Sequence, residues 1–172
     1  MPASIDLERL YDEHAQALFA FLLNLTRNEA DTRDLLQDLF VKLAQKSSLM
    51  ESVRDERAYL LRLVHNAAID LMRRRSAQQR NCEELATATD FVPAFAAAAN
   101  PDEHAFRQAL SEGLADLPAE QRAVVHLKLW EGLTFEAIAE TLGISPNTAA
   151  SRYRYGLDKL RQRLRPLYDE IK

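Results

Sequence analysis

The chain has 172 residues, of which 47% are hydrophobic, and a formal net charge of -4 at pH 7. This length fits one ordinary domain or two small ones. The single cysteine, Cys82, excludes a disulfide framework within one chain and a zinc site built on paired cysteines. The four histidines lack the short spacings that gather metal ligands on one helical turn. We therefore expect no metal site and no cofactor.

Membrane and enzyme classes are also disfavoured. No stretch approaches the roughly 18 apolar residues that a membrane span needs, and the N-terminus does not resemble a signal peptide. The chain pairs no nucleophile with a base and has no phosphate-binding glycine loop, with only four glycines in total. We expect a cytoplasmic protein that does not insert into membranes and is not an enzyme.

The first half of the chain predicts three helices, because its apolar residues recur at intervals of three and four. Ser4 is the expected cap of the first helix, and the third runs into an arginine cluster at residues 73–75. Three such helices can share one core. Their apolar positions are Leu7, Leu10, Tyr11, Leu18, Phe19, Leu22 and Leu25 in the first, Leu35, Leu36, Leu39, Phe40 and Leu43 in the second, and Tyr59, Leu60, Leu63, Val64, Ala67, Leu71 and Met72 in the third.

Helical periodicity fails between Asn81 and Pro101, where the sequence reads "CEELATATDFVPAFAAAANP". A stretch of this length is too long for a loop inside a compact domain. We predict a first domain at residues 1–80, a linker at 81–102 and a second domain at 103–172. The apolar linker residues Phe91, Val92 and Phe95 could dock on one domain or on a partner, and the sequence leaves both open.

The second half predicts a unit of four helices. Pro118 is a helix-start proline, Gly132 and Gly143 end helices, and Pro166 is expected to stop the last one. The fold class is therefore all-α, with two small helical domains joined by a linker. The apolar stripes of this half are Phe106, Leu110, Leu114 and Leu117, then Val124, Val125, Leu127 and Leu129, and finally Ala149, Tyr153, Leu157, Leu160 and Leu164.

The stretch "TFEAIAETLGISPNTAASRYRYG" has the anatomy of a helix-turn-helix. Thr134 caps a short helix, Gly143 makes the tight turn, and Ser145 caps a second helix of the kind that enters the major groove. The alternative is an ordinary helical hairpin with a charged exterior. The predicted DNA-binding residues of the second helix are Asn147, Thr148, Ser151, Arg152, Arg154 and Tyr155, with Arg152 suited to a phosphate.

The acidic total hides two basic blocks, +4 over residues 54–80 and +5 over residues 144–165. A nucleic acid responds to local potential within a Debye length of roughly 8–10 Å, so such blocks can bind phosphate. Solvated helix faces are the alternative. The first block is compatible with tracking a single strand, and its candidate residues are Arg62, His65, Asn66, Arg73 and Arg74. A local Asn66–Asp70 hydrogen bond and a half-buried core position for His65 are equally open.

A third surface is acidic. In "RDLLQDLFVKL", the side chains of Asp34, Gln37, Asp38 and Phe40 lie on or beside a helix whose leucines face inward. An acidic strip with an exposed aromatic is a usual protein-docking surface, although a plain solvated face is the alternative.

Together these motifs, in this order, resemble bacterial sigma factors of the extracytoplasmic-function group over nearly the whole chain. The segments that carry the resemblance are "DLLQDLFVKL", "AYLLRLVHNAAIDLMRRR" and "LPAEQRAVVHLKLWEGLTFEAIAETLGISPNTAASRYRYGLDKLRQRL". Gly156 departs from it, since such helices usually carry alanine there. The glycine costs roughly 1 kcal/mol of helix propensity unless it permits close packing.

The resemblance implies a role for each surface. The first domain would bind core RNA polymerase through the acidic helix. It would hold the non-template strand of the -10 element on the face bearing Arg62, Asn66 and Arg73, with the loop at about residues 46–56 helping to capture a flipped base. The second domain would read the -35 element of promoter DNA as duplex. An anti-sigma factor is a further expected partner.

Two other classes compete with this interpretation. A free-standing helix-turn-helix regulator with an N-terminal dimerisation domain would bind DNA without polymerase, but it requires neither the acidic helix nor the first basic block. An enzyme is disfavoured on the grounds given above.

Overall fold

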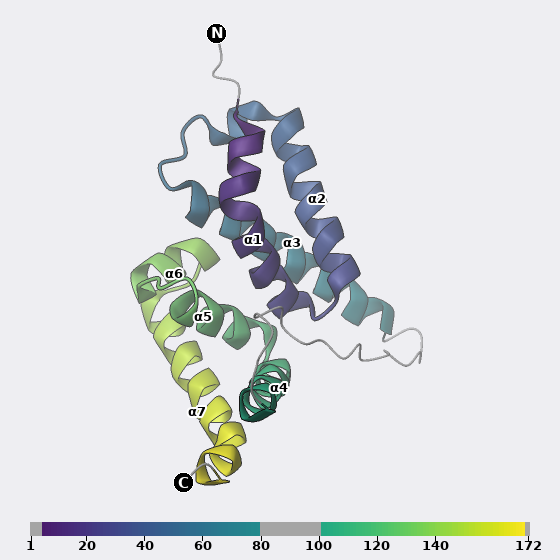
Figure 1. Cartoon of the computed structure of the whole chain (residues 1–172). Coiled ribbons are helices and arrows are strands. Elements are labelled where there is room, and N and C mark those ends of the chain that lie inside the picture. Colours follow the sequence, from purple (N-terminus) through teal and green to yellow (C-terminus); the bar gives the residue numbers. More distant parts are fainter. Residues whose placement is uncertain (1–4, 80–100, 171–172) are drawn as a thin grey trace. The chain divides into compact units, whose positions relative to one another are not determined.

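The computed structural model describes residues 5–79 and 101–170. Within these ranges every regular element is a helix, and the chain divides into two compact units, one on each side of residues 80–100 (Figure 1). The predicted all-α class with two helical domains is thus confirmed. The linker residues Phe91, Val92 and Phe95 lie outside the described ranges. Helix α4 already begins at Pro101, within the last residues of the predicted linker.

The first unit contains α1 (Leu7–Thr26), α2 (Glu29–Gln45), the short 3-10 helix η1 (Ser47–Met50) and α3 (Glu56–Gln79). The cap of α1 is Asp6, whose carboxylate accepts a hydrogen bond from the Arg9 N–H at 3.0 Å. The prediction of Ser4 as the cap was wrong because α1 starts later; Ser4 itself lies outside the described residues.

The core of the first unit lies between these three helices. Leu18 and Phe21 of α1, Leu43 of α2 and Leu60 of α3 are almost fully buried. Tyr11, which the pattern placed in the apolar stripe of α1, is instead 53% exposed. Along α3 the fully buried positions end at Ala68, so the arginine-rich end of this helix extends past the core.

The second unit contains α4 (Pro101–Asp116), α5 (Ala119–Leu129), α6 (Phe135–Leu142) and α7 (Pro146–Glu170). Its four helices confirm the predicted four-helix unit, and Pro118 lies at the N-cap of α5. The predicted stop at Pro166 was wrong, because α7 continues to Glu170 with this proline inside it. A proline removes one backbone hydrogen bond without forbidding helix beyond it, and Leu167 on its far side is half-buried.

The core of the second unit forms where α4 and α5 pack on α7. It contains Leu114, Leu117, Val125 and Leu160, all at most 3% exposed. Two residues that the apolar pattern assigned to this core lie at its edge: Phe106 is 39% and Leu129 is 50% exposed.

Two glycines allow the helices of this unit to approach closely. A Cβ atom on Gly156 of α7 would lie 2.7 Å from Val125 Cγ2 of α5. A Cβ atom on Gly113 of α4 would lie 2.9 Å from Leu160 Cδ2 of α7. Gly156 therefore permits close packing of α7 on α5, although glycine has a low helix propensity.

We expect Gly156→Ala to lower the free energy of unfolding of the second unit by about 1–2 kcal/mol, because the clash with Val125 outweighs the roughly 1 kcal/mol gain in helix propensity. Urea unfolding followed by the fluorescence of Trp130, the only tryptophan in the chain, measures this change. Gly113→Ala is the matched control. Its nearest neighbour is the terminal methyl of a leucine that can change rotamer, so a smaller loss is expected. Increased stability of Gly156→Ala would contradict the packing argument.

A histidine is buried in the same unit. His126 of α5 is 3% exposed, and its ring centroid lies 5.3 Å from that of Trp130. Burial lowers the pKa of this imidazole from 6.5 to about 4, because the charged form loses its hydration. The folded protein therefore holds His126 neutral at neutral pH.

This pKa difference predicts acid sensitivity of the second unit. Below pH 6.5 the unfolded chain takes up a proton at His126 that the folded chain rejects until about pH 4, so the free energy of unfolding falls as the pH drops through this window. Between pH 7 and pH 5 the expected loss is about 2 kcal/mol. Urea unfolding monitored by Trp130 fluorescence at both pH values measures it. His126→Gln should reduce the pH dependence, whereas the same change at exposed His104 should preserve it.

Candidate functional site

The helix-turn-helix forms as the sequence predicts. Thr134 Oγ1 accepts a hydrogen bond from the Ala137 N–H at 3.1 Å at the start of α6. Gly143 takes the left-handed conformation, with φ 69°, that glycine adopts without steric cost. Ser145 Oγ then accepts from the Thr148 N–H at 3.1 Å and caps α7. Each local signal is thus used at the position where the sequence places it.

Packing of α7 fixes which of its faces is free. Ala149 is fully buried, and the Tyr153 ring meets Phe135 of α6 edge-on, with centroids 5.5 Å apart. The predicted DNA-binding residues differ in how far they reach into solvent. Asn147, Arg154 and Tyr155 are exposed, and Thr148, Ser151 and Arg152 are half-buried.

Several of these side chains already have partners. The Arg154 guanidinium lies 5.2 Å from the centre of the Tyr155 ring, a cation–π distance. Arg152 forms an ion pair with Glu120 of α5 at 3.3 Å. Sequence patterns could not reveal the Glu120 contact, because the two residues lie 32 positions apart and no local spacing links them.

On α3, three predicted strand-binding residues share one stripe. Arg62, Asn66 and Arg73 are all exposed, and their spacings of four and seven place them on one side of a helix. The sequence left open a hydrogen bond between Asn66 and Asp70, but within the described residues these two side chains are not hydrogen-bonded to each other. Arg74 is also exposed, and its Nε lies 3.4 Å from the Asp70 carbonyl oxygen.

His65 lies differently from the other candidates on α3. It is half-buried, and its ring stacks on Phe21 of α1 with centroids 6.4 Å apart. This geometry favours the alternative that His65 is mainly a core residue, one that can support the exposed stripe from beneath.

The acidic surface on α2 has the predicted orientation. Asp34, Gln37 and Asp38 are exposed, whereas Leu39 and Leu43 face the core. Phe40 is half-buried and meets Tyr11 of α1 edge-on, with centroids 5.1 Å apart at 62°. An aromatic pair from two helices therefore borders the acidic strip.

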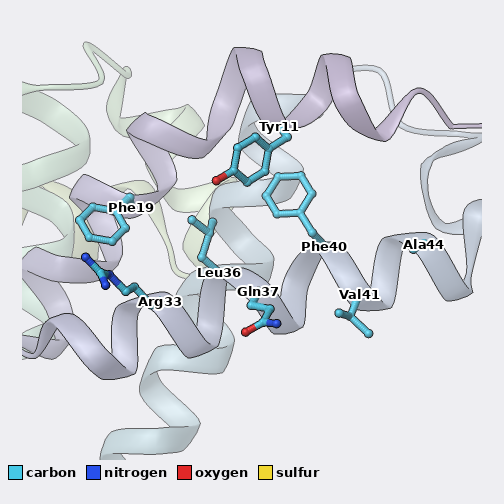
Figure 2. A pocket seen from close by; sticks show the side chains of 8 residues that line it. All are labelled: Tyr11, Phe19, Arg33, Leu36, Gln37, Phe40, Val41 and Ala44. Carbon is cyan, nitrogen blue, oxygen red and sulfur yellow. The ribbon is translucent and has the colours of Figure 1, made fainter.

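A groove of about 610 Å³ runs beside this strip between α1 and α2 (Figure 2). Figure 2 shows the rings of Tyr11 and Phe40 close together between α1 and α2. Its lining residues are Tyr11, Phe19, Arg33, Leu36, Gln37, Phe40, Val41 and Ala44. The sequence did not reveal that α1 lines part of this groove, because Tyr11 falls within the apolar stripe of that helix.

Glu13, His14 and Glu56 form a cluster whose potential ligand atoms lie within 4.8 Å of one another. Arg9, however, forms ion pairs with both carboxylates at 2.8 Å. The hydrogen bond from Arg9 also lowers the pKa of Glu56. A cation would compete with this guanidinium, so the arrangement suits an ion-pair network between α1 and α3 better than a metal site.

The fold has two helical units, one of which presents a helix-turn-helix. Together with the sequence comparisons, this fold defines a DNA-binding protein of the transcription machinery. Residues 10–78 match the family Sigma-70 region 2, and residues 113–162 match Sigma-70, region 4. The chain is 33% identical over 166 residues to the ECF RNA polymerase sigma factor SigL of Mycobacterium tuberculosis, covering 94% of this chain and 90% of that protein.

Other comparisons agree. RNA polymerase sigma factor CarQ of Myxococcus xanthus is 32% identical over 164 residues, covering 95% of this chain and 92% of that protein. Sigma factor RpoE, solved in complex with the anti-sigma factor NepR from Bartonella quintana, has the same fold. Its TM-score is 0.75 at 23% identity, covering 93% of this chain and 97% of that one.

The chain belongs to the sigma-70 family of RNA polymerase sigma factors and, within it, to the extracytoplasmic-function group. It binds core RNA polymerase and directs promoter-specific initiation of transcription. No helix in the described ranges combines the length and apolar character needed to cross a membrane.

Proposed function

We propose that the three exposed surfaces divide the work of initiation, and that the acidic face of α2 binds core polymerase. Asp34, Gln37 and Asp38 project into solvent from a helix anchored by buried leucines, and Phe40 borders the apolar groove. Two carboxylates beside an apolar surface suit a partner helix that carries both basic and apolar side chains.

The exposed stripe of α3 holds the single non-template strand at the -10 element. Arg62 and Arg73 offer cations to separate phosphates along the strand, and Asn66 between them offers an amide to a base edge. Arg74 adds charge at the flank, and His65 supports the surface through its contact with Phe21. The exposed segment around η1, directly before α3, receives the flipped base and so assists promoter melting.

The outer face of α7 reads the -35 element in the major groove. Asn147, Arg154 and Tyr155 are the most exposed candidates for base contact. Arg152, which pairs with Glu120 of α5, contacts a phosphate at the flank of this face. Thr148 and Ser151 contribute polar contacts near the start of the helix.

The observation that carries this proposal is that three different helices, α2, α3 and α7, each expose several of the predicted acidic, strand-binding or duplex-binding residues. A free-standing regulator needs only the last of these surfaces. The chain accordingly acts in the cytoplasm as a specificity subunit rather than as an enzyme. The neighbour RpoE was solved with an anti-sigma factor, and we infer that this chain has an inhibitory partner of the same kind.

Transcription in vitro tests the proposal as a whole. Core polymerase of the source organism, supplied with a promoter library, should start transcripts at defined sites only when the chain is added. A chain that shifts duplex DNA at physiological salt but never directs initiation would show that it acts as a free-standing regulator.

Two substitutions should separate the surfaces. Asp38→Arg should weaken core-polymerase binding by at least tenfold, since it reverses a charge in the acidic strip, and should leave duplex binding unchanged. Arg154→Ala should cost about 1–3 kcal/mol in binding a -35 duplex and leave polymerase affinity unchanged. Titration of labelled core polymerase and labelled duplex with the full chain measures both effects.

Asp169→Arg is the charge-matched control, because this exposed carboxylate lies near the end of α7. It should change neither affinity. Equal losses in both assays for Asp38→Arg or Arg154→Ala would refute the assignment of separate surfaces.

A further inference from the structure

One ion pair joins a buried carboxylate of α2 to an arginine of α3 that is about half exposed. Arg75 of α3 makes a two-pronged contact with Asp31 of α2, in which Nη1 donates to Oδ2 and Nη2 donates to Oδ1 at 2.6 Å. The Asp31 side chain is only 12% exposed. A bidentate arginine–carboxylate pair fixes orientation as well as distance, so this contact sets how the two helices meet.

Asp31 lies on a rigid part of α2. Its N–H donates to Asn28 Oδ1 at 3.0 Å, and Thr32 Oγ1 donates to the Asn28 carbonyl oxygen at 2.9 Å. Its carboxylate also lies in the first helical turn, where the helix dipole favours negative charge. The first turn of α2 is therefore a fixed anchor for whatever Asp31 binds.

Arg75 lies on a part of α3 with little other support. The fully buried positions of α3 end at Ala68, and residues 73–79 are all exposed. Within that described segment, Arg75 is the residue whose side chain bonds to another helix. It continues the core-facing stripe of Val64 and Ala68 at helical spacing, which places Arg73 on the opposite, outward side.

We propose that Asp31 and Arg75 are positioning residues, which hold the end of α3 so that Arg73 stays in line with Arg62 and Asn66 along a bound strand. Within the arginine cluster, Arg75 thus binds Asp31 of α2, and Arg73 binds the nucleic acid. Without the pair, the last two turns of α3 are free to fray, and Arg73 no longer meets a phosphate in register. This inference rests on the proposed strand-binding role of α3.

Binding of the full chain to a fluorescein-labelled oligo(dT) of about 20 nucleotides, followed by fluorescence anisotropy at low salt, tests the proposal. Arg73→Gln provides the reference and should weaken binding by roughly threefold to tenfold. Asp31→Asn and Arg75→Gln should each weaken it by a similar factor. The double variant should be no weaker than either single variant, because both changes remove one interaction.

Two further measurements distinguish loss of Arg73 positioning from a general loss of structure. They are the salt dependence of strand binding and the affinity for core polymerase. Each variant should reduce the slope of log affinity against log salt by about 0.7, the value for one phosphate contact on a single strand. Affinity for core polymerase should stay unchanged. Glu29→Gln is the matched control, since it removes the exposed ion pair between Glu29 and Arg33 on the same helix and should alter none of these quantities.

Three other results would each overturn a different part of the proposal. If Arg73→Gln has no effect, the strand-binding role of α3 fails. If Arg73→Gln weakens binding while Asp31→Asn preserves or strengthens it, Arg75 itself contacts the strand and the positioning role is overturned. Loss of polymerase binding together with strand binding in Asp31→Asn also overturns it, because the pair then supports the whole unit.

Discussion

In both units, each helix buries one face in the core, and this burial determines which side chains remain exposed to partners. Full burial of a leucine or phenylalanine contributes about 1.5–3 kcal/mol, far more than a surface ion pair, at about 0–1 kcal/mol. Leu39 and Leu43 therefore orient α2, and Ala149 and Leu160 orient α7. The acidic strip and the duplex-reading face are what these orientations leave outside.

The polar groups inside the units refine this arrangement. Arg122 is buried, and its Nη1 lies 3.4 Å from the carbonyl oxygen of Leu114 near the end of α4. His126 is buried in neutral form, and Asp31 is buried against Arg75. A buried polar group is costly unless it is paired, so each of these residues admits few alternative packings. They add specificity to units whose apolar contacts are non-directional.

Charge is distributed so that one chain can serve partners of opposite sign. The net charge of -4 combines acidic stretches with two basic blocks, residues 54–80, which include α3, and residues 144–165, which include most of α7. At physiological salt each surface acts over about 8 Å, so its local charge, rather than the net charge of the chain, determines which partner it attracts. Two helical units presenting different surfaces can thus engage a basic protein helix and polyanionic DNA.

Local signals determined much of this protein. Periodicity located the helices, Thr134, Gly143 and Ser145 determined the helix-turn-helix, and the order of motifs indicated the family. These features depend on residues within a few positions of one another, which is why the sequence alone reveals them. Local signals failed at two positions. Proline did not end α7, which continues past Pro166 to Glu170. The cap of α1 is Asp6 rather than Ser4, because the helix begins at Leu7.

Only the tertiary structure decided the contacts between distant residues. Gly156 packs against Val125. Tyr11 lies outside the core and lines a groove together with Phe40. Arg75 pairs with Asp31, whereas Arg73 is exposed to solvent. Three consecutive arginines look equivalent in sequence. Their directions differ by about 100° per residue around the helix, and only the position of the neighbouring helix determines which of them finds a carboxylate.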